Sequence, residues 1–352
     1  MKKIEALDFA RVVAMLSVVM IHVTSTYIFV PSGVAIGGMN LAFMLNQVTR
    51  FAVPLFILLS GLSLGLSQSG GSLGGFYKKR IVKIGVPYLV WCSLYFIYNA
   101  YPHWENLWAK GLDSLKFYGK SLLLGSPAPH LYFIVIIFQL YLLFPLLKKL
   151  VNRSPWISLL TAFLITYIAQ KAFYFLKYDF NMIPNAIKPY LWILFPTWLF
   201  YFVLGMFFSR ERLQKFCEFA EKNILALLSV TAIFSVLYVV DGYVTNSLDA
   251  IKLELNIVTF LVFASCLGLW TCVKRLAVAK KLTVFLSNHS MTIYFGHVFV
   301  ICFFRHFPIF LRGMFGMVLL YACVVVGSVI LATLIDKIFQ RRKTRSNTGG
   351  SE

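Results

Sequence analysis

The sequence predicts an all-α membrane protein of about ten transmembrane helices, with both termini in the cytoplasm. Three observations lead to this class. Hydrophobic residues make up 59% of the 352 positions, and charged residues only 13%. The apolar residues gather into long runs, and basic residues concentrate in alternate connections between those runs. Since soluble domains carry roughly 25% charged residues, most of this surface must face lipid rather than water.

The apolar runs set the number of helices. A helix that crosses the hydrocarbon core needs about 20 mostly apolar residues. Ten segments meet this requirement: 9–30, 41–66, 84–101, 131–147, 157–174, 190–208, 223–241, 254–273, 284–304 and 314–335. The N-terminus looks like a signal peptide, but Glu5, Asp8 and Arg11 interrupt it and no small-residue cleavage site follows. We therefore interpret the first segment as a retained span.

The distribution of basic residues predicts the topology. Of the 33 lysines and arginines, 22 lie before the first span, after spans 2, 4, 6 and 8, or after the last span. This is the positive-inside pattern for cytoplasmic termini. It accounts for the net charge of +20 without a nucleic acid partner. We divide the chain into a transmembrane domain, residues 1–336, and a basic cytoplasmic tail, residues 337–352, which we expect to be disordered.

Two connections differ from the others. Residues 67–75 are rich in glycine and serine and predict a flexible linker. Residues 102–130 form the longest outer connection, which carries several aromatic residues. This second connection is either an interfacial helix lying on the outer leaflet or a simple tether.

The cysteines give no indication of a metal centre. Six are scattered through the chain, mostly within apolar runs, without a CxxC pair or a Cys/His ligand spacing. We interpret them as small apolar packing residues, and we expect neither a structural zinc site nor a disulfide framework.

Arg11 and His22 are polar residues in the first span, where each is costly and therefore a functional hypothesis. Eleven residues of helix turn through about three turns plus 20°, so both side chains project from nearly the same face, about 16 Å apart along the axis. This pair suits a ligand that enters from the cytoplasm with its phosphates last. The alternative is a snorkelling arginine and a histidine bonded to a neighbouring helix.

Arg11 and His22 are separated by ten residues, and this spacing resembles the arginine–histidine signature of the acyltransferase type 3 family of membrane proteins. Further segments resemble the family's other motifs in the expected order: Pro54–Gly61, Lys79–Tyr88, His130–Phe133 and Leu286–His297. Two departures are Lys83 in place of an arginine and Tyr132 in place of a tryptophan. The position of Arg50 shortly before Val53-Pro54 resembles one branch of the family. That branch contains the enterobacterial-antigen acetyltransferases and the exopolysaccharide acyltransferases of staphylococci.

The resemblance implies an enzyme of the cell membrane, in bacteria the plasma membrane. Such an enzyme transfers an acyl group, usually acetyl from acetyl-CoA, to a hydroxyl of an extracytoplasmic polysaccharide or lipid-linked sugar. The expected partners are thus the bilayer, acyl-CoA and the sugar acceptor, with no metal. The family's arginine and histidine correspond to Arg11 and His22.

The chemistry of the residues assigns their roles. Attack of a hydroxyl on a thioester needs a base of near-neutral pKa, which imidazole supplies, so we predict His22 as the catalytic base. A transient acyl-histidine is the alternative. Arg11 and Arg80 offer forked donors for the phosphates of acyl-CoA. Lys79 either assists them or only reflects topology.

The remaining site candidates lie on other spans. Tyr294 and His297 share a helix face, with Ser290 one turn earlier. They either hydrogen-bond the oxyanion and orient His22, or form a polar contact between helices. We place His130 and Arg50 on the acceptor side, although His130 is equally well an interfacial histidine without a ligand.

Three residues near span ends, His103, His289 and His306, are expected to be solvated.

Ser60-Gly61 has no GxSxG elbow, so we favour a close helix-packing site over a nucleophile.

Two rival classes remain open. One is a transporter or flippase for a lipid-linked sugar or exopolysaccharide. A proton-coupled carrier usually buries acidic residues, and we expect Glu254 to be the only acid near a span interior. The other rival is a sensory or scaffold domain, which needs no alignment of Arg11 with His22.

Overall fold

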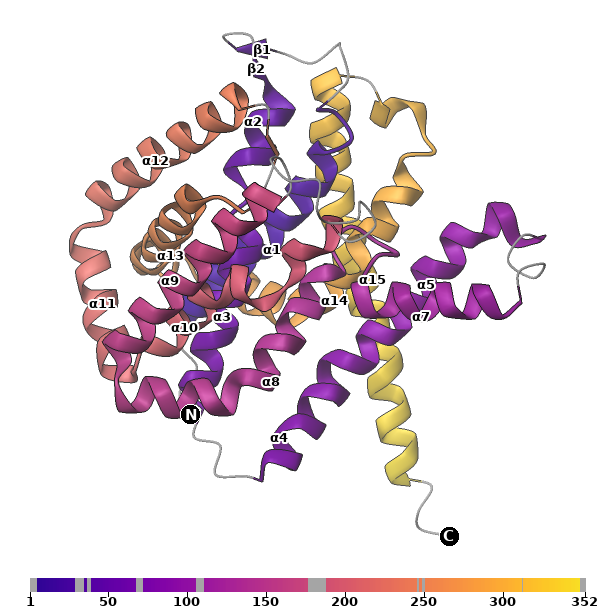
Figure 1. Cartoon of the computed structure of the whole chain (residues 1–352). Coiled ribbons are helices and arrows are strands. Elements are labelled where there is room, and N and C mark those ends of the chain that lie inside the picture. Colours follow the sequence, from indigo (N-terminus) through magenta and orange to yellow (C-terminus); the bar gives the residue numbers. More distant parts are fainter. Residues whose placement is uncertain are drawn as a thin grey trace. The chain divides into compact units, whose positions relative to one another are not determined.

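The computed structural model describes residues 5–28, 35–36, 39–67, 72–105, 111–176, 188–245, 247–248, 251–311 and 313–348. The chain forms two compact units. Unit 1 comprises Met1–Ala52, Ile224–Leu248 and Ser265–Glu352, and unit 2 comprises Val53–Asn223 and Asp249–Ala264. Helices dominate both units (Figure 1), which confirms the predicted all-α class.

Unit 1 contains the first and the last helices of the chain. In order these are α1 (Glu5–Thr24), α2 (Leu41–Val48), α12 (Ile224–Val244), α14 (Ala277–Phe304) and α15 (Gly313–Thr348), with a 3₁₀ turn at Pro308–Leu311. Two short strands, β1 (Ala35–Ile36) and β2 (Met39–Asn40), pair antiparallel between α1 and α2. Helix α13 (Leu253–Val273) begins in unit 2 and ends in unit 1.

Unit 2 contains the middle of the chain. Its helices are α3 (Ala52–Gly65), α4 (Leu73–Arg80), α5 (Val86–Ala100), α7 (Leu112–Leu124), α8 (Tyr132–Arg153), α9 (Pro155–Tyr174), α10 (Leu199–Phe207) and α11 (Arg210–Lys222). A π-helical turn, Ile81–Gly85, joins α4 to α5, and a 3₁₀ turn at Tyr101–His103 follows α5. Two more 3₁₀ turns, Lys188–Ile193 and Phe195–Trp198, precede α10.

Nine segments of the described chain are helical, long and apolar enough to cross a membrane. They correspond to nine of the ten predicted spans. The remaining predicted span, 190–208, was wrong in its length, because the apolar helical stretch there is only Phe195–Phe207. Proline at positions 189 and 196 lacks the backbone N–H that a continuous helix requires, so this segment begins as 3₁₀ turns.

Side chains satisfy the backbone groups that the broken segment leaves open. The Gln139 amide donates to the carbonyl oxygen of Ile193 at 2.9 Å and accepts from the Phe195 N–H at 3.0 Å. The Thr166 hydroxyl donates to the Pro196 carbonyl oxygen at 2.9 Å. Non-helical backbone within a membrane protein persists only where the protein supplies such partners, which explains these polar residues in otherwise apolar helices.

The third span begins earlier than predicted. Instead of starting at 84, the helical path starts at Leu73 and continues through the π-helical turn into α5. The Ser72 side chain caps α4 by accepting from the Gly75 N–H. Residues 73–75 of the predicted flexible linker are therefore helical, and residues 68–71 lie outside the described part. Lys79 and Arg80 belong to a helix rather than to a loop.

The long connection of residues 102–130 contains the predicted helix. This helix, α7, ends at Leu124, and the next residue, Gly125, caps it in the left-handed conformation with a φ of 64°. The Tyr88 hydroxyl of α5 donates to the Leu122 carbonyl, and Ser93 is hydrogen-bonded to Tyr118 at 2.6 Å. The connection thus packs against α5 and is not a simple tether. Its placement on the outer leaflet stays a prediction.

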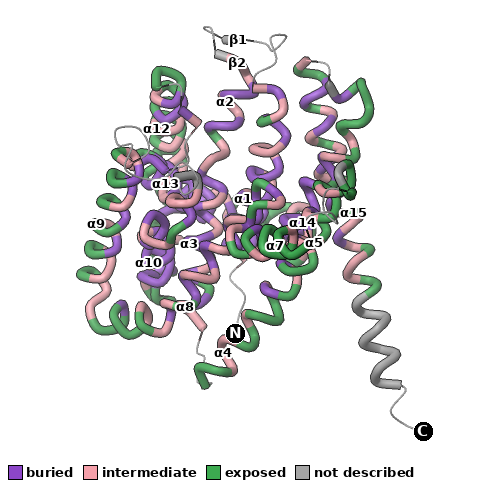
Figure 2. The backbone as a smooth tube through the Cα atoms, turned by 45° about the vertical axis from the view of Figure 1, so that its right-hand side comes forward, coloured by how far each residue is buried: buried purple, intermediate pink, exposed green. Residues whose placement is uncertain are grey.

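Burial differs strongly among the helices (Figure 2). In the most apolar 18-residue stretch of α1, 61% of the residues are buried. The corresponding share in α12 is only 11%, and α4 has no buried residue. Exposed apolar helices suit contact with lipid. Helix α1 instead belongs to the core of unit 1, where Val19 and Val23 pack with Val300 of α14 and Val324 of α15.

Helix α15 extends into the predicted tail. It continues beyond Asp336 as far as Thr348. The expectation of a disordered tail was therefore wrong for residues 337–348, whose backbone is helical. The predicted cytoplasmic location of this tail stays a prediction.

In unit 2, glycine lets α3 and α10 approach closely. A Cβ atom at Gly61 would lie 2.0 Å from the Phe202 carbonyl oxygen, and one at Gly205 would lie 2.0 Å from the Leu58 carbonyl oxygen. Small residues at helix interfaces allow such close backbone packing in membranes. The structure thus confirms Ser60-Gly61 as a packing site.

We predict that Gly61→Ala destabilises the protein by about 2 kcal/mol or more, because overpacking against rigid backbone forces the helices apart. Gly74→Ala is the matched control, since a Cβ at this helical glycine meets no atom within 4 Å. Thermal unfolding of the two variants in detergent measures the difference. Equal unfolding temperatures would contradict the proposed close contact.

Candidate active site

Helices α1 and α14 of unit 1 pack in parallel and carry the central candidate residues. The residue numbers of the contacting pairs increase in the same direction along both helices. Lys280 Nζ lies 2.9 Å from Glu5 Oε1, Arg11 Nη1 lies 3.0 Å from Ser287 Oγ, and the rings of His22 and His297 are 5.2 Å apart. Arg11 and His22 therefore both face α14, as the helical spacing predicts.

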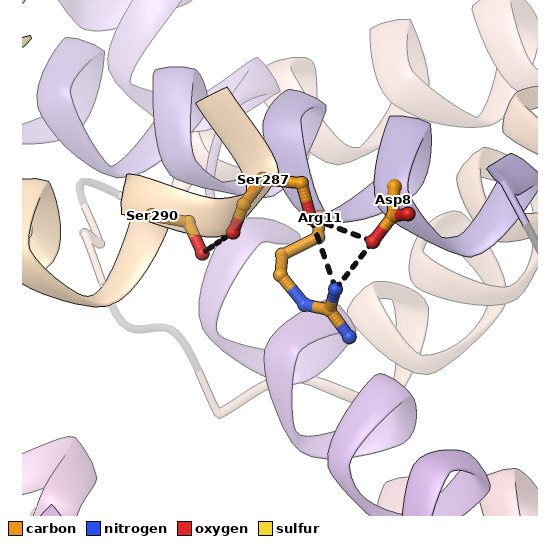
Figure 3. A network of polar contacts seen from close by, with 4 residues as sticks. All are labelled: Asp8, Arg11, Ser287 and Ser290. Carbon is orange, nitrogen blue, oxygen red and sulfur yellow. Dashed lines mark hydrogen bonds and ion pairs between the residues drawn. The ribbon is translucent and has the colours of Figure 1, made fainter. Parts of the chain in front are cut away.

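Arg11 is held in a polar triangle (Figure 3). Its Nη1 atom donates to Asp8 Oδ1 at 2.8 Å and to Ser287 Oγ at 3.0 Å. The Ser287 hydroxyl donates in turn to the same Asp8 oxygen at 2.7 Å. Ser290 completes the local network, because its hydroxyl donates to the Ser287 carbonyl oxygen at 2.8 Å. Asp8 is 2% exposed and Arg11 29% exposed, so the pair is accessible only from the arginine side.

The second polar level contains His22, His297 and Tyr294. His297 is fully buried, and its Nδ1 lies 2.7 Å from the Tyr294 carbonyl oxygen. A carbonyl oxygen only accepts, so Nδ1 carries the proton, and in the neutral ring Nε2 keeps the lone pair. His22 beside it is half-buried, and the Tyr294 ring lies 6.1 Å from that of His297. The structure therefore brings His22, His297 and Tyr294 together.

Arg50 belongs to the same end of α1 as His22. Its Nε and Nη2 atoms donate to Asn46 Oδ1 at 3.0 and 2.7 Å. The amide nitrogen of Asn46 donates to the Ile21 carbonyl oxygen at 2.9 Å and to Thr24 Oγ1 at 3.0 Å. Asn46 is completely buried. This side chain thus fixes Arg50 to the segment of α1 that carries His22, and away from the level of Arg11.

Arg80 and Lys79 lie in unit 2. The Arg80 guanidinium lies over the rings of Phe76 and Tyr141, at 5.3 and 5.6 Å from their centroids. It forms no hydrogen bond within the described chain, and its Nε is buried. Lys79 is exposed. Aromatic stacking orients the Arg80 fork and leaves its donors for another group. Its predicted role in binding acyl-CoA together with Arg11 stays a prediction.

His130 is buried, and not at an exposed surface as its position before a span indicated. It is 2% exposed and makes an edge contact with Tyr95 of α5 at 5.4 Å between ring centroids. It lies in the turn between α7 and α8. Packing of α5 against this turn covers the histidine, which the sequence neighbours alone do not indicate. Its role toward an acceptor stays a prediction.

Three site residues escaped the sequence interpretation: Asp8, Ser287 and Asn46. The expectation that Glu254 is the only acid near a span interior was wrong, because Asp8 is buried within α1. Its spacing of three residues before Arg11 is the signal that would have found it. Ser287 lies in the motif segment Leu286–His297, but its contact with Arg11 was not predictable, because Arg11 lies on another helix. Asn46 gave no comparable signal, because its partner Ile21 lies on another helix.

The three histidines expected to be solvated have different outcomes. His289 is only 16% exposed, and its Nε2 lies 3.2 Å from Asp336 Oδ2 of α15; that expectation was wrong. His306 is exposed, as expected. The side chain of His103 lies outside the described residues.

Across the ranges that the structure describes, no three His, Cys, Asp or Glu side chains are grouped to hold a metal ion. The six cysteines are all free thiols.

A multi-pass helical membrane protein with an arginine and a histidine aligned on its first span is the class that these features define. The chain belongs to the acyltransferase type 3 family, whose model, described as "Acyltransferase domain", matches residues 4–337. It is an acyltransferase that transfers groups other than aminoacyl groups, in a bacterial membrane.

The chain is similar to several curated bacterial proteins. It is 24% identical over 303 residues to the "Putative membrane-bound acyltransferase YfiQ" of Bacillus subtilis (strain 168). The aligned region covers 84% of this chain and 81% of that protein. It is also 24% identical over 308 residues to the "Probable poly-beta-1,6-N-acetyl-D-glucosamine export protein" of Staphylococcus aureus (strain Mu50 / ATCC 700699), covering 86% and 83%. No solved structure matches the chain.

We predict that Asn46→Ala lowers the acyl-transfer rate about tenfold, because Arg50 loses the side chain that fixes it near His22. Gln47→Ala is the matched control. Gln47 is an adjacent buried amide, whose Nε2 donates to the Ser247 carbonyl oxygen at 2.8 Å. Each variant loses about 1–3 kcal/mol of stability through unpaired buried groups.

Rates and unfolding temperatures of both purified variants separate the two effects. Equal losses of rate in both variants would show that Asn46 matters only for stability.

Proposed function

We propose that the protein is an O-acyltransferase that moves an acyl group, acetyl from cytoplasmic acetyl-CoA, to a hydroxyl of an extracytoplasmic polysaccharide or lipid-linked sugar. The observation that carries the proposal is the parallel contact of α1 with α14. This contact places Arg11 and His22 against one neighbouring helix, through Ser287 and His297 respectively.

The spacing of the two residues suits an acyl-CoA donor. Arg11 and His22 are about 16 Å apart along the helix axis. In acyl-CoA a long flexible arm separates the phosphates from the thioester, so one molecule can present both groups at once. Arg11 binds a phosphate of this donor. The predicted cytoplasmic N-terminus puts Arg11 at the side from which the coenzyme comes.

The proposed reaction uses His22 as general base. The acceptor hydroxyl gives its proton to the His22 ring while its oxygen attacks the thioester carbonyl carbon. The tetrahedral intermediate then collapses, the C–S bond breaks, and the sulfur leaves with the proton from the imidazolium. An ester and a free thiol result. His297, with its Nδ1–H held by the Tyr294 carbonyl, packs beside the His22 ring and restricts its orientation.

Arg50 suits the acceptor side of this reaction. It is fixed near His22 by Asn46, where its guanidinium N–H groups suit hydrogen bonds to the hydroxyl oxygens of a sugar. The sugar acceptor is supported by the name of the staphylococcal relatives, which refers to poly-beta-1,6-N-acetyl-D-glucosamine. His130 remains an acceptor-side hypothesis, now from a buried position.

Export of a lipid-linked sugar or exopolysaccharide is the second candidate. The printed name of the staphylococcal relatives favours it, and Asp8 is the buried acid that a proton-coupled carrier would require. However, Asp8 is ion-paired with Arg11 and hydrogen-bonded to Ser287. The Asp8 carboxylate is therefore already engaged in contacts that position Arg11, so acyl transfer is the better account.

We predict that His22→Ala abolishes release of free thiol from acetyl-CoA in the presence of a sugar acceptor, while folded protein remains in the membrane. General-base catalysis contributes about 10²–10⁴-fold. His306→Ala is the control, because His306 is exposed and, among the described residues, its ring bonds only the backbone of its own helix. Undiminished turnover in His22→Ala would end the assignment of the base.

The same purified protein discriminates the two candidates. In nanodiscs, an acyltransferase yields acylated sugar, detected by mass spectrometry, without any gradient. A carrier moves labelled lipid-linked sugar across proteoliposomes and leaves acetyl-CoA intact. Sugar transport without thioester loss would replace acyl transfer by export.

A further inference from the structure

Within the described part of the chain, the Arg11 guanidinium uses only one of its three nitrogen atoms. Both of its hydrogen bonds, to Asp8 Oδ1 and to Ser287 Oγ, come from Nη1. Nε and Nη2 form no bond with the part of the chain that the structure describes. In Figure 3 this second edge points away from Asp8 and Ser287. With 29% of the side chain exposed, the edge is accessible to another molecule.

A planar guanidinium held at one corner presents a defined fork at the opposite edge. The N–H bonds of Nε and Nη2 are parallel, a geometry that matches two oxygens of a phosphate or carboxylate. A free arginine side chain loses much rotamer freedom when it binds an anion. Where Nη1 is already tethered, most of that freedom is lost before the ligand arrives, so binding is stronger for the same contacts.

Ser287 makes the tether directional. Its hydroxyl proton points to Asp8 Oδ1 at 2.7 Å, which turns the oxygen lone pairs toward Arg11 Nη1 at 3.0 Å. A single carboxylate oxygen thus accepts from Arg11 and from the serine that also binds Arg11. Asp8 is on α1 and Ser287 is on α14, so this triangle requires both helices to be in register.

We propose that Asp8 and Ser287 are positioning residues that hold Arg11 by Nη1, so that its Nε–Nη2 edge binds a phosphate of the acyl-CoA donor in a bidentate manner. The proposal rests on the proposed function, which supplies the donor, and adds two residues that do not touch the reacting atoms. Asp8 also neutralises part of the arginine charge, so recognition depends on the fork geometry as well as on attraction to any anion.

The test compares five variants in nanodiscs: Asp8→Ala, Ser287→Ala, Ser287→Thr, Thr283→Ala and, as the reference without the guanidinium, Arg11→Ala. The first two remove the tether. Ser287→Thr keeps a hydroxyl and should rescue binding. Thr283→Ala is the control, since Thr283 is a buried residue one turn earlier on α14 whose hydroxyl does not bond to Arg11. The measurements are the dissociation constant of CoA by calorimetry and the Michaelis constant and turnover number for acetyl-CoA and for S-acetyl-pantetheine, which has no phosphate.

We expect Asp8→Ala and Ser287→Ala to weaken CoA binding and raise the Michaelis constant for acetyl-CoA by about tenfold or more, the loss typical of a hydrogen bond to a charged group. Turnover numbers should change little, and kinetics with S-acetyl-pantetheine should match the wild type. A purely structural role would instead lower activity with both donors alike.

The outcomes separate the inference from the proposed function. If wild-type protein binds no CoA, the donor assignment itself fails. If the wild type binds CoA and Arg11→Ala does not, but Asp8→Ala and Ser287→Ala bind as tightly as the wild type, the positioning role is wrong. Equal losses with both donors also overturn it.

Discussion

The parallel packing of α1 against α14 is the constraint on which the site depends. A single helix can align Arg11 and His22 on one face, but it cannot fix either side chain. The neighbouring helix supplies Ser287 at the level of Arg11 and His297 at the level of His22. An ion pair between Glu5 and Lys280 also joins the first turns of the same two helices. The two levels therefore keep a constant separation as long as the helices stay in register.

Lipid raises the cost of each polar side chain, and the network at the site shows how this cost is met. A charged group within the membrane needs a partner, because no water is available there. Asp8 compensates Arg11, Asn46 holds Arg50, and the Tyr294 carbonyl accepts from His297. Each of these partners orients a side chain as well as satisfying it. Stability and preorganisation of the site thus come from the same contacts.

The sequence predicted the elements whose signal is local. Long apolar runs identified the spans, and the helical repeat correctly placed Arg11 and His22 on one face. Features that depend on contacts between helices were not predictable: the position of Asn46 beside Ile21, or the burial of His130 beneath Tyr95. The broken segment before α10 was missed because an apolar count ignores proline. Asp8 was a different kind of error, since its spacing from Arg11 was visible but was interpreted only as an interruption of a leader.

The most direct measurement is an experimental structure of the protein in nanodiscs with a non-hydrolysable acetyl-CoA analogue. We expect a phosphate at the Nε–Nη2 edge of Arg11 and the carbonyl carbon of the analogue next to the His22 ring, on the side of α1 that faces α14. An analogue bound elsewhere, or one that reaches Arg11 while its acyl end is remote from His22, would contradict the idea that a single donor spans both residues.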